Sequence, residues 1–226
     1  LTDARAYTQL LSGNPVAVPL LWMNDEDATR KMRFGYSATW LSDNYNFVAA
    51  LPHPDGRMWD LIRAANINKD VAIWRKRDTT PSLEFSPREP VMNFPGVPDV
   101  IAWNRDGVYD LLMAQANGTI LRLSRDRSSE KLAFQTPGIP VGDVCAAIEL
   151  KPLIFPCVVD LHGHGRSDLL VGTGDGFVFL FEDVGDDKEV KYARSRRLMD
   201  ANGFIQVSGP ACPTIIEEKG KRALLV

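Results

Sequence analysis

The chain has 226 residues, a net charge of −3 and 45% hydrophobic residues, which is enough apolar material for a core of ordinary size. A slightly acidic chain lacks the basic surface by which proteins bind nucleic acid, so nucleic acid is excluded as a partner. No apolar run reaches the length of about 18 residues that a membrane span requires, and no membrane span is predicted.

Residues 1–45 do not share the pattern of the rest of the chain. Thr2–Leu11 predicts a short helix, which Gly13 would end. Val16–Met23 and Lys31–Leu41 predict two strands, joined by an acidic loop. We interpret this segment as an N-terminal helix followed by the outer strands of a preceding sheet.

A sequence unit recurs through the rest of the chain. PCVVDLHGHGRSDLLVGTGDGFVFLF (156–181) aligns without a gap with PDVIAWNRDGVYDLLMAQANGTILRL (98–123), 58 residues earlier. Two glycines and one aspartate match in the two copies: Gly107 and Gly165, Asp110 and Asp168, Gly118 and Gly176. A fixed long period indicates one structural unit that is used several times.

Weaker copies flank these two. The segment 46–65 carries Asp60 at the position of Asp168, and a last copy begins near Cys212. Each unit predicts a short apolar strand, a polar loop, a second apolar strand, a tight turn and a third strand. Asx-Gly turns such as Asn117-Gly118 are strong hairpin signals. More polar fourth strands are predicted at Lys131–Phe134 and Val190–Arg194.

Three or four antiparallel strands in each period of 50 to 58 residues are typical of one blade of a β-propeller. We therefore predict an all-β propeller of four-stranded blades in one domain. Its parts are the outer strands of a preceding blade at 1–45, blades at 46–97, 98–154 and 155–211, and the start of a further blade at 212–226. A seven-bladed ring completed by further sequence or another chain is the preferred arrangement, and a closed four-bladed ring is the alternative.

The pattern of an apolar strand, a Gly-containing acidic loop, Asp-Leu-Leu-Val-Gly and an Asx-Gly turn resembles the FG-GAP/VCBS repeats. These repeats build the propellers of integrin α-subunits and of secreted bacterial proteins. The resemblance covers about 46–226. It implies a secreted or cell-surface location, and Ca²⁺ bound in the loop between the first two strands of a blade. It specifies the fold much better than the function, because one fold hosts many functions.

The candidate ion ligands lie in these loops. The 98–123 copy offers Asn104, Asp106 and Asp110 for Ca²⁺, although Ala102 stands where the first Asp belongs. The 156–181 copy offers Asp160, His162, His164 and Asp168. Imidazole is a better ligand for Zn²⁺ or another transition metal than for Ca²⁺. The alternative is that these are ordinary turns, in which Asp and Gly make local hydrogen bonds.

The functional prediction is a binding module that recognises carbohydrate or protein through its propeller loops. Trp59 and Tyr109, next to the loops, could stack on sugars or pack between blades. Arg194–Arg197 predicts an edge strand that could also grip an acidic polysaccharide. One alternative is a lyase acting on uronic-acid polysaccharides, with His162, His164 and Arg166 near a Tyr. Another is a structural domain of a larger protein. Cys157 and Cys212 are predicted to be buried thiols.

Overall fold

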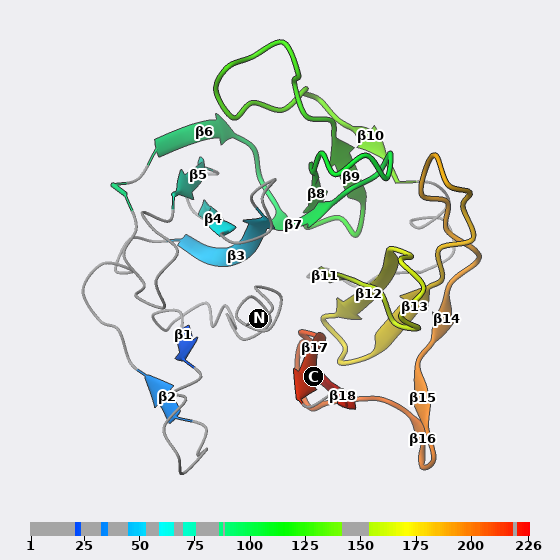
Figure 1. Cartoon of the computed structure of the whole chain (residues 1–226). Coiled ribbons are helices and arrows are strands. Elements are labelled where there is room, and N and C mark those ends of the chain that lie inside the picture. The colour runs from blue at the N-terminus through cyan, green and yellow to red at the C-terminus, as the bar shows by residue number, and fades with distance from the viewer. Residues whose placement is uncertain are drawn as a thin grey trace. The chain divides into compact units, whose positions relative to one another are not determined.

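The computed structural model describes residues 21–23, 33–35, 45–52, 59–65, 70–75, 86–87, 89–141, 154–218 and 221–226. All regular secondary structure in these residues is β-strand, as the sequence predicts (Figure 1). The helix predicted at Thr2–Leu11 lies outside the described residues. Within them, nothing forms a helix long and apolar enough to cross a membrane.

Three four-stranded antiparallel sheets dominate the described structure. In each, every strand pairs with the strand that follows it in the sequence. Sheet 1 contains β3 (Tyr45–Pro52), β4 (Trp59–Ala65), β5 (Asp70–Trp74) and β6 (Glu89–Asn93). Sheet 2 contains β7 (Val97–Ile101), β8 (Asp110–Ala114), β9 (Ile120–Leu123) and β10 (Ile139–Pro140). Sheet 3 contains β11 (Ile154–Val159), β12 (Asp168–Thr173), β13 (Val178–Phe181) and β14 (Arg196–Arg197).

Three two-stranded sheets complete the described strands. β1 (Leu21–Met23) pairs with β2 (Arg33–Gly35), inside the two strands predicted for the N-terminal segment. β15 (Met199–Asp200) and β16 (Gly203–Phe204) form a short hairpin directly after β14 (Figure 1). β17 (Thr214–Glu218) and β18 (Lys221–Leu225) pair in the last repeat copy.

The chain divides into two compact units. The first consists of residues 1–95 and 216–222 and contains sheet 1. The second consists of residues 96–215 and 223–226 and contains sheets 2 and 3. The two best repeat copies and both predicted ion loops belong to the second unit.

The second strand of sheet 3 explains why the repeat carries an unbroken apolar run. Leu169 and Val171 point to one face of β12 and join a core cluster with Leu112 of sheet 2. Leu170 points to the other face and packs in a second cluster with Ile215. Because successive strand residues alternate between faces, a strand that is covered on both sides must be apolar throughout. Each fully buried Leu or Val contributes about 1.5–3 kcal/mol.

The outermost strands differ from the prediction. The segments Lys131–Phe134 and Val190–Arg194 supply only isolated bridges, and the fourth strands are β10 and β14, several residues later. The predicted positions were wrong because these segments double back along the end of the third strand before the chain turns to the edge. The true edges carry Pro140 in β10 and arginines in β14, residue types that discourage further strand pairing.

Candidate functional site

The two predicted ion loops follow the same backbone path. In the loop of sheet 2, Arg105 has a φ of 52° and Gly107 a φ of 76°. At the matching positions in sheet 3, Gly163 and Gly165 both have a φ of 73°. This agreement confirms the 58-residue alignment at the level of backbone conformation. Side chains at matching positions can therefore be compared directly.

In the loop of sheet 3, the Asp160 carboxylate binds the backbone of its own loop. Its Oδ1 accepts the amide of His164 at 2.9 Å, and its Oδ2 accepts the amide of Gly165 at 2.8 Å. His162 and His164 are exposed and stack with their ring centroids 6.2 Å apart. His162 Nε2 lies 3.8 Å from Glu182 Oε1. The two imidazoles thus lie on the surface of the loop.

In the loop of sheet 2, Ala102 replaces Asp160, and its carbonyl accepts the Arg105 amide at 3.0 Å. Asp106 Oδ1 accepts the Val108 amide at 3.0 Å, and Asp106 Oδ2 pairs with the guanidinium of Arg127. The hydrogen bond from this guanidinium is the main cause that lowers the pKa of Asp106 below its ordinary value. Asn104 is exposed.

Asp110 and Asp168 are buried at the first position of the second strand in their sheets. Asp110 Oδ1 accepts the amide of Arg125 at 2.8 Å, and its Oδ2 accepts Arg122 Nε at 2.7 Å. Asp168 Oδ1 accepts the amide of Asp183 at 2.9 Å. Both amides come from the residue 15 positions later in the chain. These two aspartates therefore attach the end of the third strand to the start of the second.

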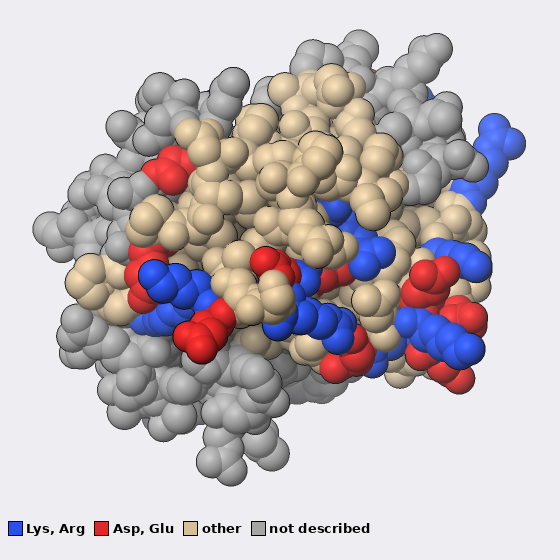
Figure 2. Space-filling view, turned by 90° about the horizontal axis from the view of Figure 1, so that it is seen from above, with Lys and Arg blue, Asp and Glu red and all other residues tan. Residues whose placement is uncertain are grey.

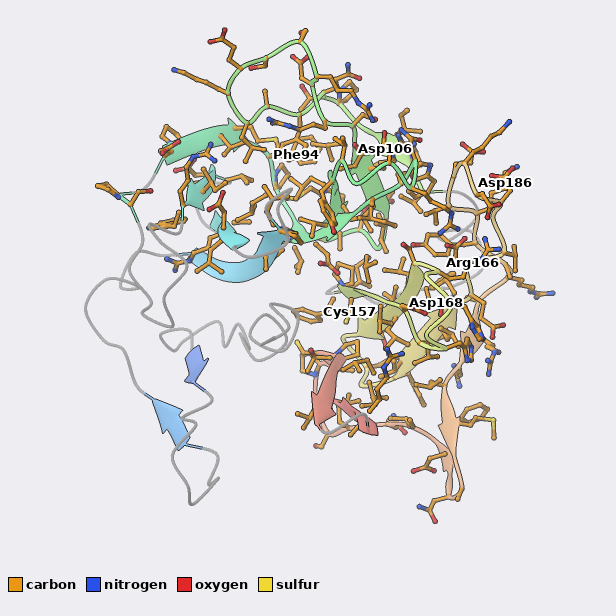
Figure 3. All side chains as sticks on the ribbon, in the orientation of Figure 1. Phe94, Asp106, Cys157, Arg166, Asp168 and Asp186 are labelled. Atoms are coloured by element: carbon orange, nitrogen blue, oxygen red, sulfur yellow. The ribbon has the colours of Figure 1, made fainter. Side chains whose placement is uncertain are left out.

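Arg105 connects the loops of sheets 2 and 3. Its Nη2 donates to Asp183 Oδ2 at 2.6 Å, its Nε to the carbonyl of Asp186 at 2.6 Å and its Nη1 to the carbonyl of Gly165 at 3.3 Å. Arg166 donates to the carbonyl of Gly185 in the same loop. In Figure 3, Arg166 and Asp186 lie on loops that flank the strands of sheet 3, and Asp106 lies on the loop of sheet 2. The loops at this end of the two sheets form one hydrogen-bonded layer.

The side chain of Asp183 is buried within this layer. Besides Arg105, it accepts the backbone amides of Ser167 at 2.9 Å, Gly185 at 3.0 Å and Lys191 at 3.2 Å. Burial acts to raise the pKa of Asp183, but these amides and the Arg105 guanidinium outweigh it and hold the pKa below its ordinary value. A buried carboxylate with four donors is fully satisfied.

The predicted ligands do not converge on a metal ion. Among the described residues, no three His, Cys, Asp or Glu side chains are grouped closely enough to hold one. The four loop aspartates accept hydrogen bonds on both oxygens, and the two histidines are exposed. As placed here, the predicted side-chain ligands do not form a Ca²⁺ or Zn²⁺ site, and binding of either ion stays a prediction from the sequence.

Aromatic residues near the loops pack between the sheets. Trp103 lies under the guanidinium carbon of Arg122, 4.7 Å from its ring centroid, and makes an edge contact with Tyr192 at 6.2 Å. Tyr109 is half-buried, and the side chain of Trp59 lies outside the described residues. Cys157 and Cys212 are free thiols, and burial raises the pKa of both, that of Cys212 to about 11.

A second surface lies at the outer edge of sheet 3. The guanidinium carbon of Arg197 lies 4.3 Å from the ring centroid of Phe177, 5.7 Å from that of Phe179 and 5.5 Å from that of Phe204. Phe204 is 55% exposed, and Met199, its cross-strand partner, is 59% exposed. We call these five residues the outer-edge patch.

The cation of the outer-edge patch differs from its neighbour in the strand. Arg196 pairs with Glu182 at 3.0 Å, whereas no described carboxylate forms an ion pair with Arg197. Elsewhere, positive and negative side chains stand close together, as in the face shown in Figure 2. The sequence singled out Arg194–Arg197 but not the three phenylalanines. Phe177 and Phe179, two positions apart on one strand, were the signal that could have found them.

Comparison with known proteins adds no relative. No protein-family model matches the chain, and no curated protein matches it. The resemblance to FG-GAP/VCBS repeats therefore stays a prediction that rests on the sequence motifs.

Proposed function

We propose that the chain is a secreted or cell-surface binding module of the β-propeller type, with an acidic carbohydrate as its ligand. The observation that carries this proposal is the exposed residue Arg197, whose guanidinium carbon lies over the ring of Phe177 and near the exposed Phe204. A guanidinium over an aromatic ring that forms no ion pair can still donate its N–H groups to a carboxylate or sulfate. The exposed ring of Phe204 offers an apolar surface to the C–H face of a sugar.

The propeller arrangement is supported by the meander sheets and by the core that sheets 2 and 3 share. A ring of seven blades, completed by further sequence or by another chain, is the preferred form, and four blades are the alternative.

The test measures binding by isothermal titration calorimetry with polygalacturonate, heparin and neutral dextran. Arg197→Ala is expected to weaken binding of the acidic polymers about tenfold, the loss of one charge-assisted contact. Arg196→Ala is the matched control, since it removes the same charge from the same strand but from a residue paired with Glu182. Equal losses in both variants would mean non-specific attraction and would contradict the proposal, as would absence of binding.

Two further measurements separate the alternatives. Polyglutamate binding that depends on Arg197 and exceeds polysaccharide binding would indicate a protein ligand. Ultraviolet absorbance of unsaturated products during incubation with polygalacturonate tests the lyase alternative. Arg166, one of the residues that this alternative needs, donates to loop carbonyls of Gly185 and Asp186, which favours binding over catalysis.

A further inference from the structure

The acidic loops of sheets 2 and 3 contain their own positive groups. Asp106 and Arg127 pair across two loops of sheet 2, and Asp183 receives Arg105 from the neighbouring sheet. Asp160 accepts two amides of its own loop. In a loop built around Ca²⁺, six to eight oxygens of such residues face the ion. In this chain Asp106 Oδ2 faces the Arg127 guanidinium, and both oxygens of Asp160 face loop amides.

We propose that Arg127 holds the Asp106 carboxylate in the place of a divalent cation, so that the loop of sheet 2 closes without a bound ion. An ion that approached Asp106 would meet the charge of Arg127 on Oδ2 and the Val108 amide on Oδ1. Like charges repel, so the ion could bind only after the arginine had left. The positive charge that the loop needs is covalently part of the chain.

The loop of sheet 3 indicates how a carboxylate could be added to the loop of sheet 2. Since they share one backbone path, an aspartate introduced at Ala102 would stand where Asp160 stands. It would join Asn104 and Asp106 on the same loop. Ala102→Asp combined with Arg127→Gln therefore adds one carboxylate and releases another from its guanidinium. This double variant should bind Ca²⁺, whereas the unchanged chain should not.

The experiment measures the thermal midpoint of unfolding, Tm, in EDTA and in millimolar CaCl₂. The unchanged chain is expected to show the same Tm in both, within about 1 °C. The double variant is expected to gain about 5–10 °C in CaCl₂. A bound ion raises Tm by about this amount when its concentration is about one hundred times the dissociation constant. Isothermal titration with CaCl₂ alone measures the same difference as heat.

Single variants isolate the role of the arginine. Arg127→Gln in EDTA is expected to lower Tm by about 2–4 °C, the size of a surface ion-pair effect in a chain of this length. Lys131→Gln is the matched control, because Lys131 is an exposed cation in the same loop that forms no ion pair with a described residue. It should leave Tm unchanged.

Three outcomes would overturn the proposal. The first is a Tm of the unchanged chain that falls in EDTA and recovers with Ca²⁺. The second is an Arg127→Gln variant as stable as the Lys131→Gln control. The third is a folded double variant that takes up no Ca²⁺, since the loop would then not arrange its oxygens as an ion requires.

Discussion

Arg105 offers the sharpest test of how sheets 2 and 3 are held together. Its side chain is 14% exposed and that of its partner Asp183 is fully buried. Removing one member of a buried ion pair costs about 3–5 kcal/mol, and the low end applies because Asp183 keeps three amide donors. We therefore expect Arg105→Ala to lower the free energy of unfolding by about 3 kcal/mol.

The backbone of Arg105 makes glycine the informative second variant. Its φ of 52° is a left-handed conformation, which costs a residue with a side chain about 1 kcal/mol more than glycine. Arg105→Gly should therefore be about 1 kcal/mol more stable than Arg105→Ala, although glycine is ordinarily the more destabilising of the two substitutions. Urea unfolding of both variants, and of each combined with Asp183→Asn, measures this order and the coupling. An alanine variant at least as stable as glycine, or losses below about 1 kcal/mol, would refute the reasoning.

Two further predictions follow from backbone space and from pH. Gly165 and Gly176 both have positive φ, but a Cβ at Gly176 would lie 2.1 Å from the carbonyl oxygen of Val207, whereas Gly165 has open space. Alanine at 165 should cost about 1 kcal/mol and alanine at 176 clearly more by urea unfolding, and equal costs would contradict this. Burial raises the pKa of Asp99 from 3.8 to about 7, although the Val158 amide acts to lower it. Because the pKa of Asp99 is higher in the folded state, the folded state binds its proton more tightly than the unfolded state does. The free energy of unfolding is therefore highest below about pH 4 and falls as the pH rises through 7, by at most about 4 kcal/mol. Asp99→Asn should lack this loss, and parallel stability curves of the two proteins between pH 4 and 8 would refute it.

The repeat made most of the central strands predictable. Asp110 and Asp168 mark the start of the second strand in sheets 2 and 3, and the turns at Gly118 and Gly176 join the second and third strands. These features are local, since a buried aspartate, an apolar run and a glycine with positive φ are each visible in the sequence. The edge strands were missed because they carry few apolar residues and only two residues pair in each.

The candidate site was predicted less well. Sequence motifs identified Asp106 but could not show that it pairs with Arg127 of another loop, nor that Arg105 reaches Asp183 in the neighbouring sheet. The distance along the chain between Arg105 and Asp183, 78 residues, exceeds one repeat. The outer-edge patch was missed for the same reason, since Phe204 reaches Arg197 only through the hairpin of β15 and β16.

The bonds between sheets 2 and 3 make the energetic unit larger than the sequence repeat. The Val190 amide donates to the Trp103 carbonyl at 3.0 Å, and both sheets contribute to one core cluster. Opening sheet 2 would expose Leu169 and Val171 and remove Arg105 from Asp183. Amide hydrogens in β8 and β12 should therefore exchange with solvent in one cooperative event. Either copy produced as a separate chain should therefore fail to fold stably, although each carries a complete sequence repeat.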